Sequence, residues 1–177
     1  MYLVAIMDYF SRYVLSWSVS NSLESLFCID ALDEALGISR PGIFHSDQGK
    51  QYSSVKFVET LRERDIRISM SGRGRVFDNI LVERLWRTVK YEEVYLREYA
   101  DGHQLIRSLR LYFDYYNNRR PHSSLAYRTP AEVYFAGGDS LCCASATPSL
   151  GKAKEQYKPL QLTPNTKENL VLTMGRG

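Results

Sequence analysis

Two acidic residues of this chain stand where a divalent metal ion could be held. Asp47 follows the short apolar segment Ile43-Phe44, and Glu83 lies in the first turns of an expected helix. Open α/β sheets place their ligands just beyond the carboxyl ends of the strands. Hard cations take carboxylate oxygens, and two of them about 3.5–4 Å apart can activate a hydroxyl and stabilise the leaving oxygen of a phosphodiester. Asp47 and Glu83 are therefore the candidate catalytic and metal-binding residues.

The residues around this pair resemble those of bacterial insertion-sequence transposases with a retroviral-integrase type of catalytic core. Residues 45–54 are similar to the motif around the family's second aspartate, and Glu83 follows Asp47 with the characteristic 35 residues between them. Residues 72–92 resemble the block around the family's glutamate. Residues 116–132 resemble its closing signature, with Asn-x-x-Arg-Pro-His. The resemblance spans about residues 2–136.

This resemblance implies a ribonuclease H-like fold, in which a mixed sheet is flanked by helices. It implies metal-dependent cleavage of a phosphodiester and strand transfer during DNA transposition. Asp47 and Glu83 are then ligands of two Mg²⁺ (or Mn²⁺) ions. The expected partners are DNA, as transposon ends and target, and further copies of the chain, because the intact family forms homo-oligomers.

The family's first catalytic aspartate has no counterpart here, because it lies on a strand upstream of the one that residues 2–7 resemble. The resemblance thus implies a core that is truncated at its N-terminus and lacks the family's first strand, which is central in the sheet. The two strands beside the vacant position would then each present a row of unpaired backbone groups. We expect weak metal binding and no activity of the chain alone. Asp8 is interpreted as a turn residue that bonds its own backbone, not as a substitute ligand. A further hypothesis places residues 170–173, which have strand character, in the vacant position.

Two other functions remain open. The chain could be a DNA-binding or oligomerisation remnant of a decayed mobile element, without catalysis, and the missing strand favours this reading. A ribonuclease H-type nuclease has the same architecture, but the Asn-x-x-Arg-Pro-His signature disfavours it.

Basic residues near Glu83 are the candidate contacts to DNA phosphates. Lys90 follows Glu83 by seven residues, two helical turns, and so lies on the same helix face. Arg84 and Arg87 share that helix, where the alternative is an ordinary solvated face. Arg119 and Arg120 form a basic turn for DNA or a partner subunit. The net charge of +3 does not by itself indicate nucleic acid.

Hydrophobic periodicity predicts the elements that position these residues. We expect strands over 2–7, 13–19, 43–44 and 66–70, and helices over about 22–36, 54–64, 79–90, 103–116 and 131–135. Asn21 or Ser22 is the expected cap of the first helix, and Gly37 its end. Residues 1–136 then form the integrase-type core, and residues 137–177 a tail of unknown structure.

Composition and the N-terminal residues indicate the cellular compartment of the protein. The 177 residues suffice for one domain, and the three cysteines show no zinc-binding spacing. The apolar opening Met1–Met7 ends at Asp8, too early for a signal peptide or a membrane span. We therefore expect a bacterial cytoplasmic, nucleoid-associated protein with no membrane partner.

Overall fold

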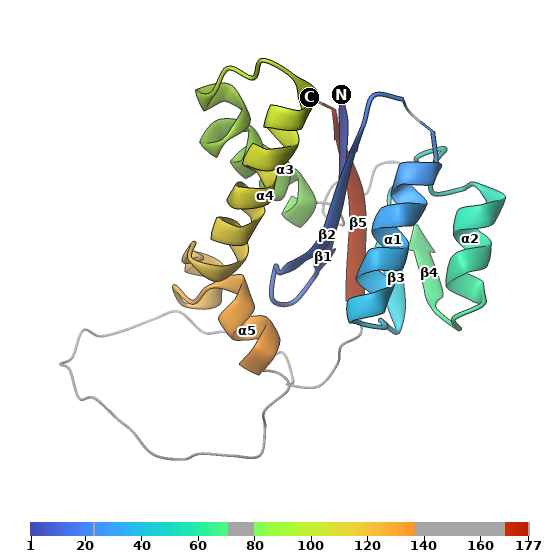
Figure 1. Cartoon of the computed structure of the whole chain (residues 1–177). Helices are drawn as coiled ribbons and strands as arrows, with labels where there is room; N and C mark the ends of the chain where they lie inside the picture. Colours follow the sequence, from blue (N-terminus) through green and yellow to red (C-terminus); the bar gives the residue numbers. More distant parts are fainter. Residues whose placement is uncertain (23, 71–79, 137–168, 177) are drawn as a thin grey trace, which may run out of the picture.

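The computed structural model describes residues 1–22, 24–70, 80–136 and 169–176, the last of these as a backbone strand. A single five-stranded sheet has the order β2-β1-β5-β3-β4 (Figure 1). Its strands are β1 (Tyr2–Asp8), β2 (Val14–Ser20), β3 (Ile43–Ser46), β4 (Arg67–Met70) and β5 (Asn169–Arg176). The mixed α/β sheet that the sequence predicts is confirmed.

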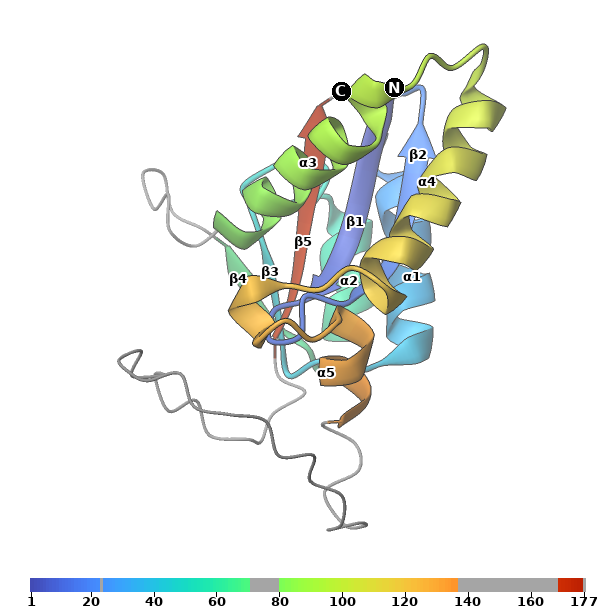
Figure 2. The ribbon, with the colours of Figure 1, turned by 90° about the vertical axis from the view of Figure 1, so that its left-hand side faces the viewer.

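Helices cover both faces of this sheet. The helices α1 (Leu26–Ile38) and α2 (Val55–Arg62) lie on one face, and α3 (Ile80–Glu92) and α4 (Gly102–Asn118) on the other (Figures 1 and 2). The short elements η2 (Val94–Leu96), η3 (Ser123–Leu125) and α5 (Pro130–Ala136) complete the described part. Among these ranges no helix is both long enough and apolar enough to cross a lipid bilayer.

Alternation along β1 divides the core into two layers. Val4 and Ile6 are buried with α1 and α2, whereas Ala5 and Met7 are buried with α3 and α4. A strand that is covered on both faces must be apolar at every position, and this explains the continuous hydrophobic run near the start of the chain.

The central position of the sheet, which the resemblance leaves vacant, is occupied by β5. This strand runs antiparallel to β1 and parallel to β3. The hypothesis that residues 170–173 fill this position is therefore confirmed. The segment expected to be a tail of unknown structure, 137–177, contributes a strand to the middle of the core sheet. The physical reason is that the facing edges of β1 and β3 need backbone partners, which an apolar strand can provide.

The first helix begins later and ends later than the sequence predicts. Its N-cap is Ser25, not Asn21 or Ser22, and it continues through Gly37 to Ile38. Ser22 instead takes part in a turn after β2, where its N–H donates to the Ser20 hydroxyl at 3.1 Å. Local hydroxyl-to-backbone bonds of this kind compete with helix capping, so the cap cannot be chosen from residue type alone.

The side-chain amide of Asn117 fastens α4 to the start of β2. The Val14 N–H donates to Asn117 Oδ1 at 2.9 Å, and Asn117 Nδ2 donates to the Val14 carbonyl at 2.9 Å. Both groups are buried. One residue thus satisfies a backbone donor and a backbone acceptor across the layers, and the position of α4 depends on it.

We expect Asn117→Ala to lower the free energy of unfolding by roughly 2–4 kcal/mol, because it leaves two buried backbone groups without partners. The matched control is Asn118→Ala. Asn118 is exposed and bonds Asp114 of its own helix, so its loss should cost less than about 0.5 kcal/mol. Urea denaturation of the three proteins measures both values. Equal effects of the two substitutions would show that the Asn117 bonds do not hold α4.

Candidate metal and nucleic-acid site

Asp47 is oriented by the backbone immediately after β3. The Gly49 N–H donates to its Oδ1 at 2.9 Å, and the other carboxylate oxygen makes no hydrogen bond with the described residues. A Cβ atom at position 49 would lie only 2.9 Å from Asp47 Oδ1 and 3.1 Å from the ring of Tyr52. A side chain at position 49 would therefore force Asp47 or Tyr52 to shift, and the second oxygen of Asp47 accepts no hydrogen bond from the described residues.

Glu83 lies on the exposed side of α3, in the first turn of the helix. The opposite side of α3 is buried against the sheet through Val82, Leu85, Trp86 and Val89. A carboxylate in a first turn is favoured by the helix dipole. Arg87 and Lys90 follow Glu83 by four and seven residues and share its face, so the structure brings this predicted acid and two of the predicted DNA contacts into one stripe.

Asp47 follows directly after the last residue of β3, Ser46, which is the register partner of Leu172 on β5. Phe44 of β3 is buried with α1 and α2, so position 45 belongs to the face that α3 covers. Position 173, the next residue of β5, pairs with Ala5, which faces α3 and α4. Figure 2 shows α3 crossing in front of β5.

Asp47 thus stands at the end of β3, and α3, the helix that carries Glu83, covers one face of the same sheet. Within the described ranges, no group of three or more His, Cys, Asp and Glu side chains is placed to hold a metal ion. Residues 71–79, which the resemblance assigns to the block preceding Glu83, lie outside the described part.

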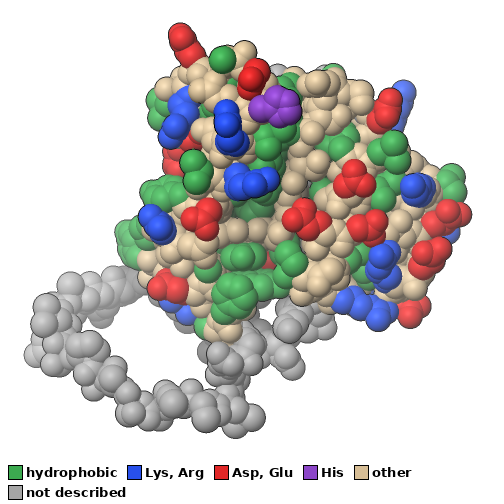
Figure 3. Space-filling model, in the orientation of Figure 1, with side chains coloured by type: hydrophobic (Ala, Val, Ile, Leu, Met, Phe, Trp, Pro, Cys, Tyr) green, Lys and Arg blue, Asp and Glu red, His purple; other side chains and the backbone are tan. Residues whose placement is uncertain are grey.

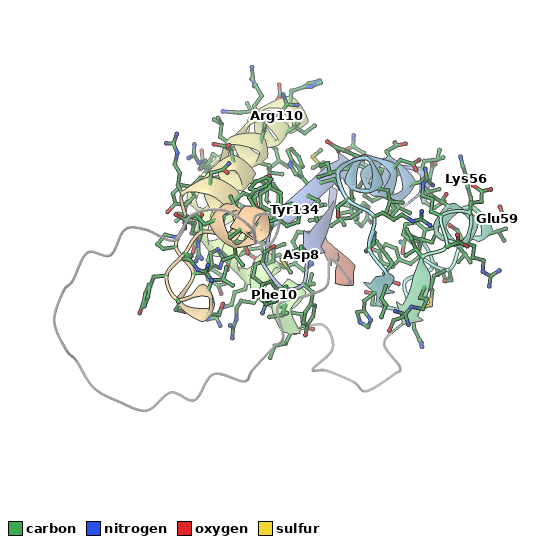
Figure 4. The ribbon with its side chains drawn as sticks, turned by 90° about the horizontal axis from the view of Figure 1, so that it is seen from below. Asp8, Phe10, Lys56, Glu59, Arg110 and Tyr134 are labelled. Atoms are coloured by element: carbon green, nitrogen blue, oxygen red, sulfur yellow. The ribbon has the colours of Figure 1, made fainter. Side chains whose placement is uncertain are left out.

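Asp8 has the role that the sequence predicts. Its Oδ2 accepts hydrogen bonds from the N–H of Ser11 at 2.7 Å and from the Ser11 hydroxyl at 2.5 Å. Figure 4 shows Asp8 and Phe10 at the end of β1. Tyr134 stacks on Tyr13, with ring centroids 4.7 Å apart, and so packs α5 against this turn. The carboxylate of Asp8 stabilises the turn, and this interpretation is confirmed.

The two arginines of the predicted basic turn differ in their surroundings. Arg119 is exposed. Arg120 forms a forked ion pair with Glu92, with Nε–Oε2 at 2.9 Å and Nη2–Oε1 at 2.6 Å, and Glu92 also accepts from the hydroxyl of Tyr112 at 3.1 Å. The hydrogen bond from Arg120 lowers the pKa of Glu92. Arg120 thus has an intramolecular partner that competes with any DNA phosphate.

Sequence reasoning missed this network, although both halves lie in motifs that it singled out. Glu92 ends α3, and Arg120 follows α4, 28 residues later. No helical or strand period relates the two residues. Only tertiary packing brings the end of α3 together with the turn after α4. An opposite charge near the other motif is too weak a signal to assign the pair.

His122 is kept neutral near this network. Its ring meets the Tyr116 ring edge-on with centroids 4.8 Å apart. Burial, followed by the positive charges of Arg120 and Arg12, lowers the pKa of His122 to about 4. The folded state therefore binds a proton on this ring less readily than the unfolded chain, whose histidines titrate near 6.5.

The stabilisation linked to neutral His122 should be complete above pH 6.5 and decline as the pH falls toward 4. The ring is only half-buried, and solvent screening reduces the expected loss to about 1 kcal/mol. We expect His122→Gln to remove this part of the pH dependence. The control is His103→Gln, at an exposed position of α4. Urea titrations at pH 7 and 4.5 compare the proteins. An unchanged pH dependence in His122→Gln would exclude this role.

Opposite charges are paired on the face formed by α1 and α2. Arg64 lies 3.0 Å from Asp33, and Arg40 lies 3.5 Å from Asp65. Acidic and basic side chains are interspersed there (Figure 3). This face presents no field of a single sign. The three basic residues of α3, Arg84, Arg87 and Lys90, are therefore the better candidates for phosphate contacts.

Comparison with known proteins agrees with the fold and with the motifs. Two family models, each described as an integrase core domain, match residues 1–76 and 64–130. The transposase for insertion sequence element IS629 of Shigella sonnei is 33% identical over 147 residues, which cover 79% of this chain and 50% of that protein. The chain thus spans about half the length of this curated relative.

Solved retroviral integrases share the fold at low identity. The catalytic core domain of BIV integrase has a TM-score of 0.62 at 16% identity and covers 77% of this chain and 86% of its own. The HTLV-2 integrase catalytic core domain in complex with magnesium, in a dimeric form, has a TM-score of 0.51 at 20% identity, covering 75% of this chain and 84% of its own. These likenesses define a ribonuclease H-like integrase fold.

The chain belongs to the insertion-sequence transposases with an integrase-type core. The resemblance carried by residues 45–54, 72–92 and 116–132 is thereby confirmed at the level of the family.

Proposed function

We propose that this chain is the catalytic-core part of a DNA transposase, in which Asp47 and Glu83 hold divalent metal ions for cleavage and joining of phosphodiesters. The observation that carries the proposal is that Asp47 stands at the end of β3, held by the Gly49 N–H, in the same sheet that α3, the helix with Glu83, covers.

The donor set fits Mg²⁺ or Mn²⁺, since both groups are carboxylates on regular elements or at their ends and one oxygen of Asp47 accepts no bond from the described residues. The magnesium complex of the HTLV-2 integrase core supports this choice. Bound metal would supply Lewis-acid activation of the attacking hydroxyl and of the phosphodiester. Lys90 and Arg87, on the face of Glu83, would hold the DNA backbone. Water and then a DNA hydroxyl are the nucleophiles, without a covalent enzyme–DNA intermediate.

The chain alone should bind these ions weakly and lack strand-transfer activity. The family's intact site has a further aspartate on its central strand, and here that position is filled by residues 169–176, which include neither aspartate nor glutamate. The same observation favours the second candidate function, a non-catalytic remnant that keeps DNA binding and subunit contacts. Both functions place the protein with DNA in the bacterial cytoplasm, as a homo-oligomer, consistent with the dimeric form of the HTLV-2 core.

A Mg²⁺-dependent strand-transfer assay on the purified chain tests its catalytic capacity. We expect no joined product above that of Glu83→Gln. Robust joining that Glu83→Gln abolishes would contradict the expected inactivity while supporting the role of Glu83.

DNA binding is tested separately by Lys90→Ala. We expect affinity for double-stranded DNA to fall severalfold and the salt dependence to lose about one phosphate contact. Lys56→Ala is the matched control, because Lys56 lies on α2, away from α3 (Figure 4). Titrations at several salt concentrations measure both. Identical binding by the two variants would remove Lys90 from the DNA-binding surface.

A further inference from the structure

Three arginines from separate parts of the chain gather beside the connection between β1 and β2. Arg12 lies in this connection, Arg84 lies on α3, and Arg120 follows the end of α4. The charge of Arg84 acts on Arg12, and the charges of Arg12 and Arg120 both act on the half-buried ring of His122. Like charges repel one another at such short range, and a bound anion would relieve this repulsion.

Arg12 is held in an unfavourable state. Its φ is 67°, in the left-handed region that residues with a Cβ atom rarely adopt. Its Cζ lies over the Tyr9 ring, 5.3 Å from the centroid, and its Nη1 is buried with no hydrogen-bond partner among the described residues. Burial lowers the pKa of Arg12, and the charge of Arg84 lowers it further. Strained backbone and buried donors without acceptors are features that gather at binding sites.

The acidic residues nearby are engaged with other groups. Glu92 is held in the fork of Arg120, at 2.6 and 2.9 Å. The Oδ2 atom of Asp8 accepts both hydrogen bonds from Ser11. Asp8 therefore acts on Arg12 through its charge alone, without a printed bond to the guanidinium. The arginines exceed these two carboxylates in number, so positive charge is left over on the side of Arg12.

The opposite side of this arginine cluster is fixed in position. The Cζ atom of Arg120 lies 5.9 Å from the centroid of the Tyr116 ring, and its Nη1 lies 3.5 Å from Nε2 of His122. Tyr116 is buried and meets the His122 ring edge-on. Because the ion pair with Glu92 and these ring contacts already hold Arg120, little side-chain freedom would be lost on this side when a ligand binds.

We propose that the arginine cluster (Arg12, Arg84 and Arg120) binds one phosphate group of a DNA strand, in addition to the metal site. The planar guanidinium of Arg12 suits a forked contact to phosphate oxygens, and Arg84 supplies a second positive charge. Arg12 is only partly buried as a whole, so a rotation of its long side chain brings Nη1 to the ligand. Arg84 shares α3 with Arg87 and Lys90, so the DNA-contacting surface would extend from α3 to the turn after α4. The assignment to DNA rests on the proposed function, whereas the binding of phosphate itself does not.

Inorganic phosphate tests the site without DNA or metal. The full chain, with ¹⁵N in its arginine side chains, is titrated with phosphate at an ionic strength held constant with NaCl, and NMR follows the Nε signals. We expect the signals of Arg12 and Arg84 to shift and saturate. Arg12→Gly should remove the shift of Arg84, whereas Arg62→Gln, which removes a charge from α2 on the other face of the sheet, should keep it (Figure 1). Absence of a saturable shift in the unaltered chain would overturn the phosphate site.

The same variant separates a binding role of Arg12 from a structural one. Glycine readily adopts a φ of 67°, so Arg12→Gly should fold and, without phosphate, melt about 2–4 °C higher than the unaltered chain. Phosphate should raise the melting temperature of the unaltered chain, since a ligand stabilises the state that binds it, and leave that of Arg12→Gly unchanged. An equal rise in both proteins would place the bound phosphate elsewhere and overturn the proposal.

A labelled double-stranded oligonucleotide distinguishes DNA from free phosphate as the ligand. Arg12→Gly should lower DNA affinity severalfold and remove about one phosphate contact from the salt dependence, and Arg62→Gln should change neither. Phosphate shifts at Arg12 without any loss of DNA affinity in Arg12→Gly would assign the site to free phosphate and overturn its assignment to DNA. Weaker DNA binding by Arg12→Gly together with normal binding by Lys90→Ala would support this site and contradict the DNA contact of Lys90 in the proposed function.

Discussion

Deletion of residues 165–177 should lower the melting temperature by at least about 10 °C or abolish cooperative unfolding. The deletion removes the central strand, with seven register pairs to β1 and four to β3. Backbone hydrogen bonds contribute about 0.5–1.5 kcal/mol each, and the whole domain is expected to be stable by only 5–15 kcal/mol. The loss of two ladders is therefore comparable to the total stability. Circular dichroism melting measures the effect.

Single proline substitutions distinguish the effect of losing strand pairing on the melting temperature from the effect of shortening the chain. Leu172 has register partners on both sides, Ile6 and Ser46, so Leu172→Pro should reproduce most of the destabilisation. Gly177→Pro lies beyond the end of β5 at Arg176 and should leave the melting temperature within about 1 °C. If the deletion and both proline variants melt like the unaltered chain, β5 does not belong to the sheet.

Thr173→Asp in the chain itself should raise its affinity for Mn²⁺ at least about tenfold, because position 173 pairs with Ala5 on the side of the sheet covered by α3, the helix that carries Glu83, and the change adds a third carboxylate there. The new charge should also destabilise the protein in the absence of metal and be compensated when metal binds, since ligands stabilise the state that binds them. Isothermal titration and thermal melting with and without Mn²⁺ measure the two effects.

The control for this variant is Thr173→Asn, which has nearly the same shape and no charge. It should show neither the gain in affinity nor the metal-dependent rise in melting temperature. Thr173→Asp combined with Glu83→Gln should lose most of the gain. Equal Mn²⁺ affinity in Thr173→Asp and Thr173→Asn would show that position 173 does not face the metal site.

Much of the fold could be predicted from the sequence, because its signals are local. The apolar run at residues 2–7 indicates a strand buried on both faces, and the structure has β1 there. The spacing of Val82, Leu85, Trp86 and Val89 gives α3 its buried side and leaves Glu83 exposed. These features follow from the strand and helix periods, which a single segment reveals.

The position of β5 could be predicted only in part. Residues 170–173 have strand character, but their own sequence does not say which edges they pair with. That choice depends on the edges of β1 and β3 that would otherwise be unpaired. In the chain, β1 lies 160 or more residues before β5, and β3 lies about 125 residues before it. Such a vacancy is visible only when the missing family strand is considered.

The acidic residues of the candidate site could be predicted from the sequence, but the contacts that hold the structure around them could not. Asp47 and Glu83 stand out by position and by the family motifs. The Gly49 contact that orients Asp47, the pair of Arg120 with Glu92, and the bonds of Asn117 to Val14 depend on tertiary packing. No residue type or spacing distinguishes these partners from the many other polar residues nearby.

The role of Asp47 and Glu83 as ligands of a shared ion is tested most directly by paramagnetic broadening of amide resonances with Mn²⁺. The signals of Gly49 and Glu83 should broaden together at the same Mn²⁺ concentration. Asp47→Asn or Glu83→Gln should each abolish the broadening at both places. Broadening near one residue that survives removal of the other carboxylate would contradict a common metal site.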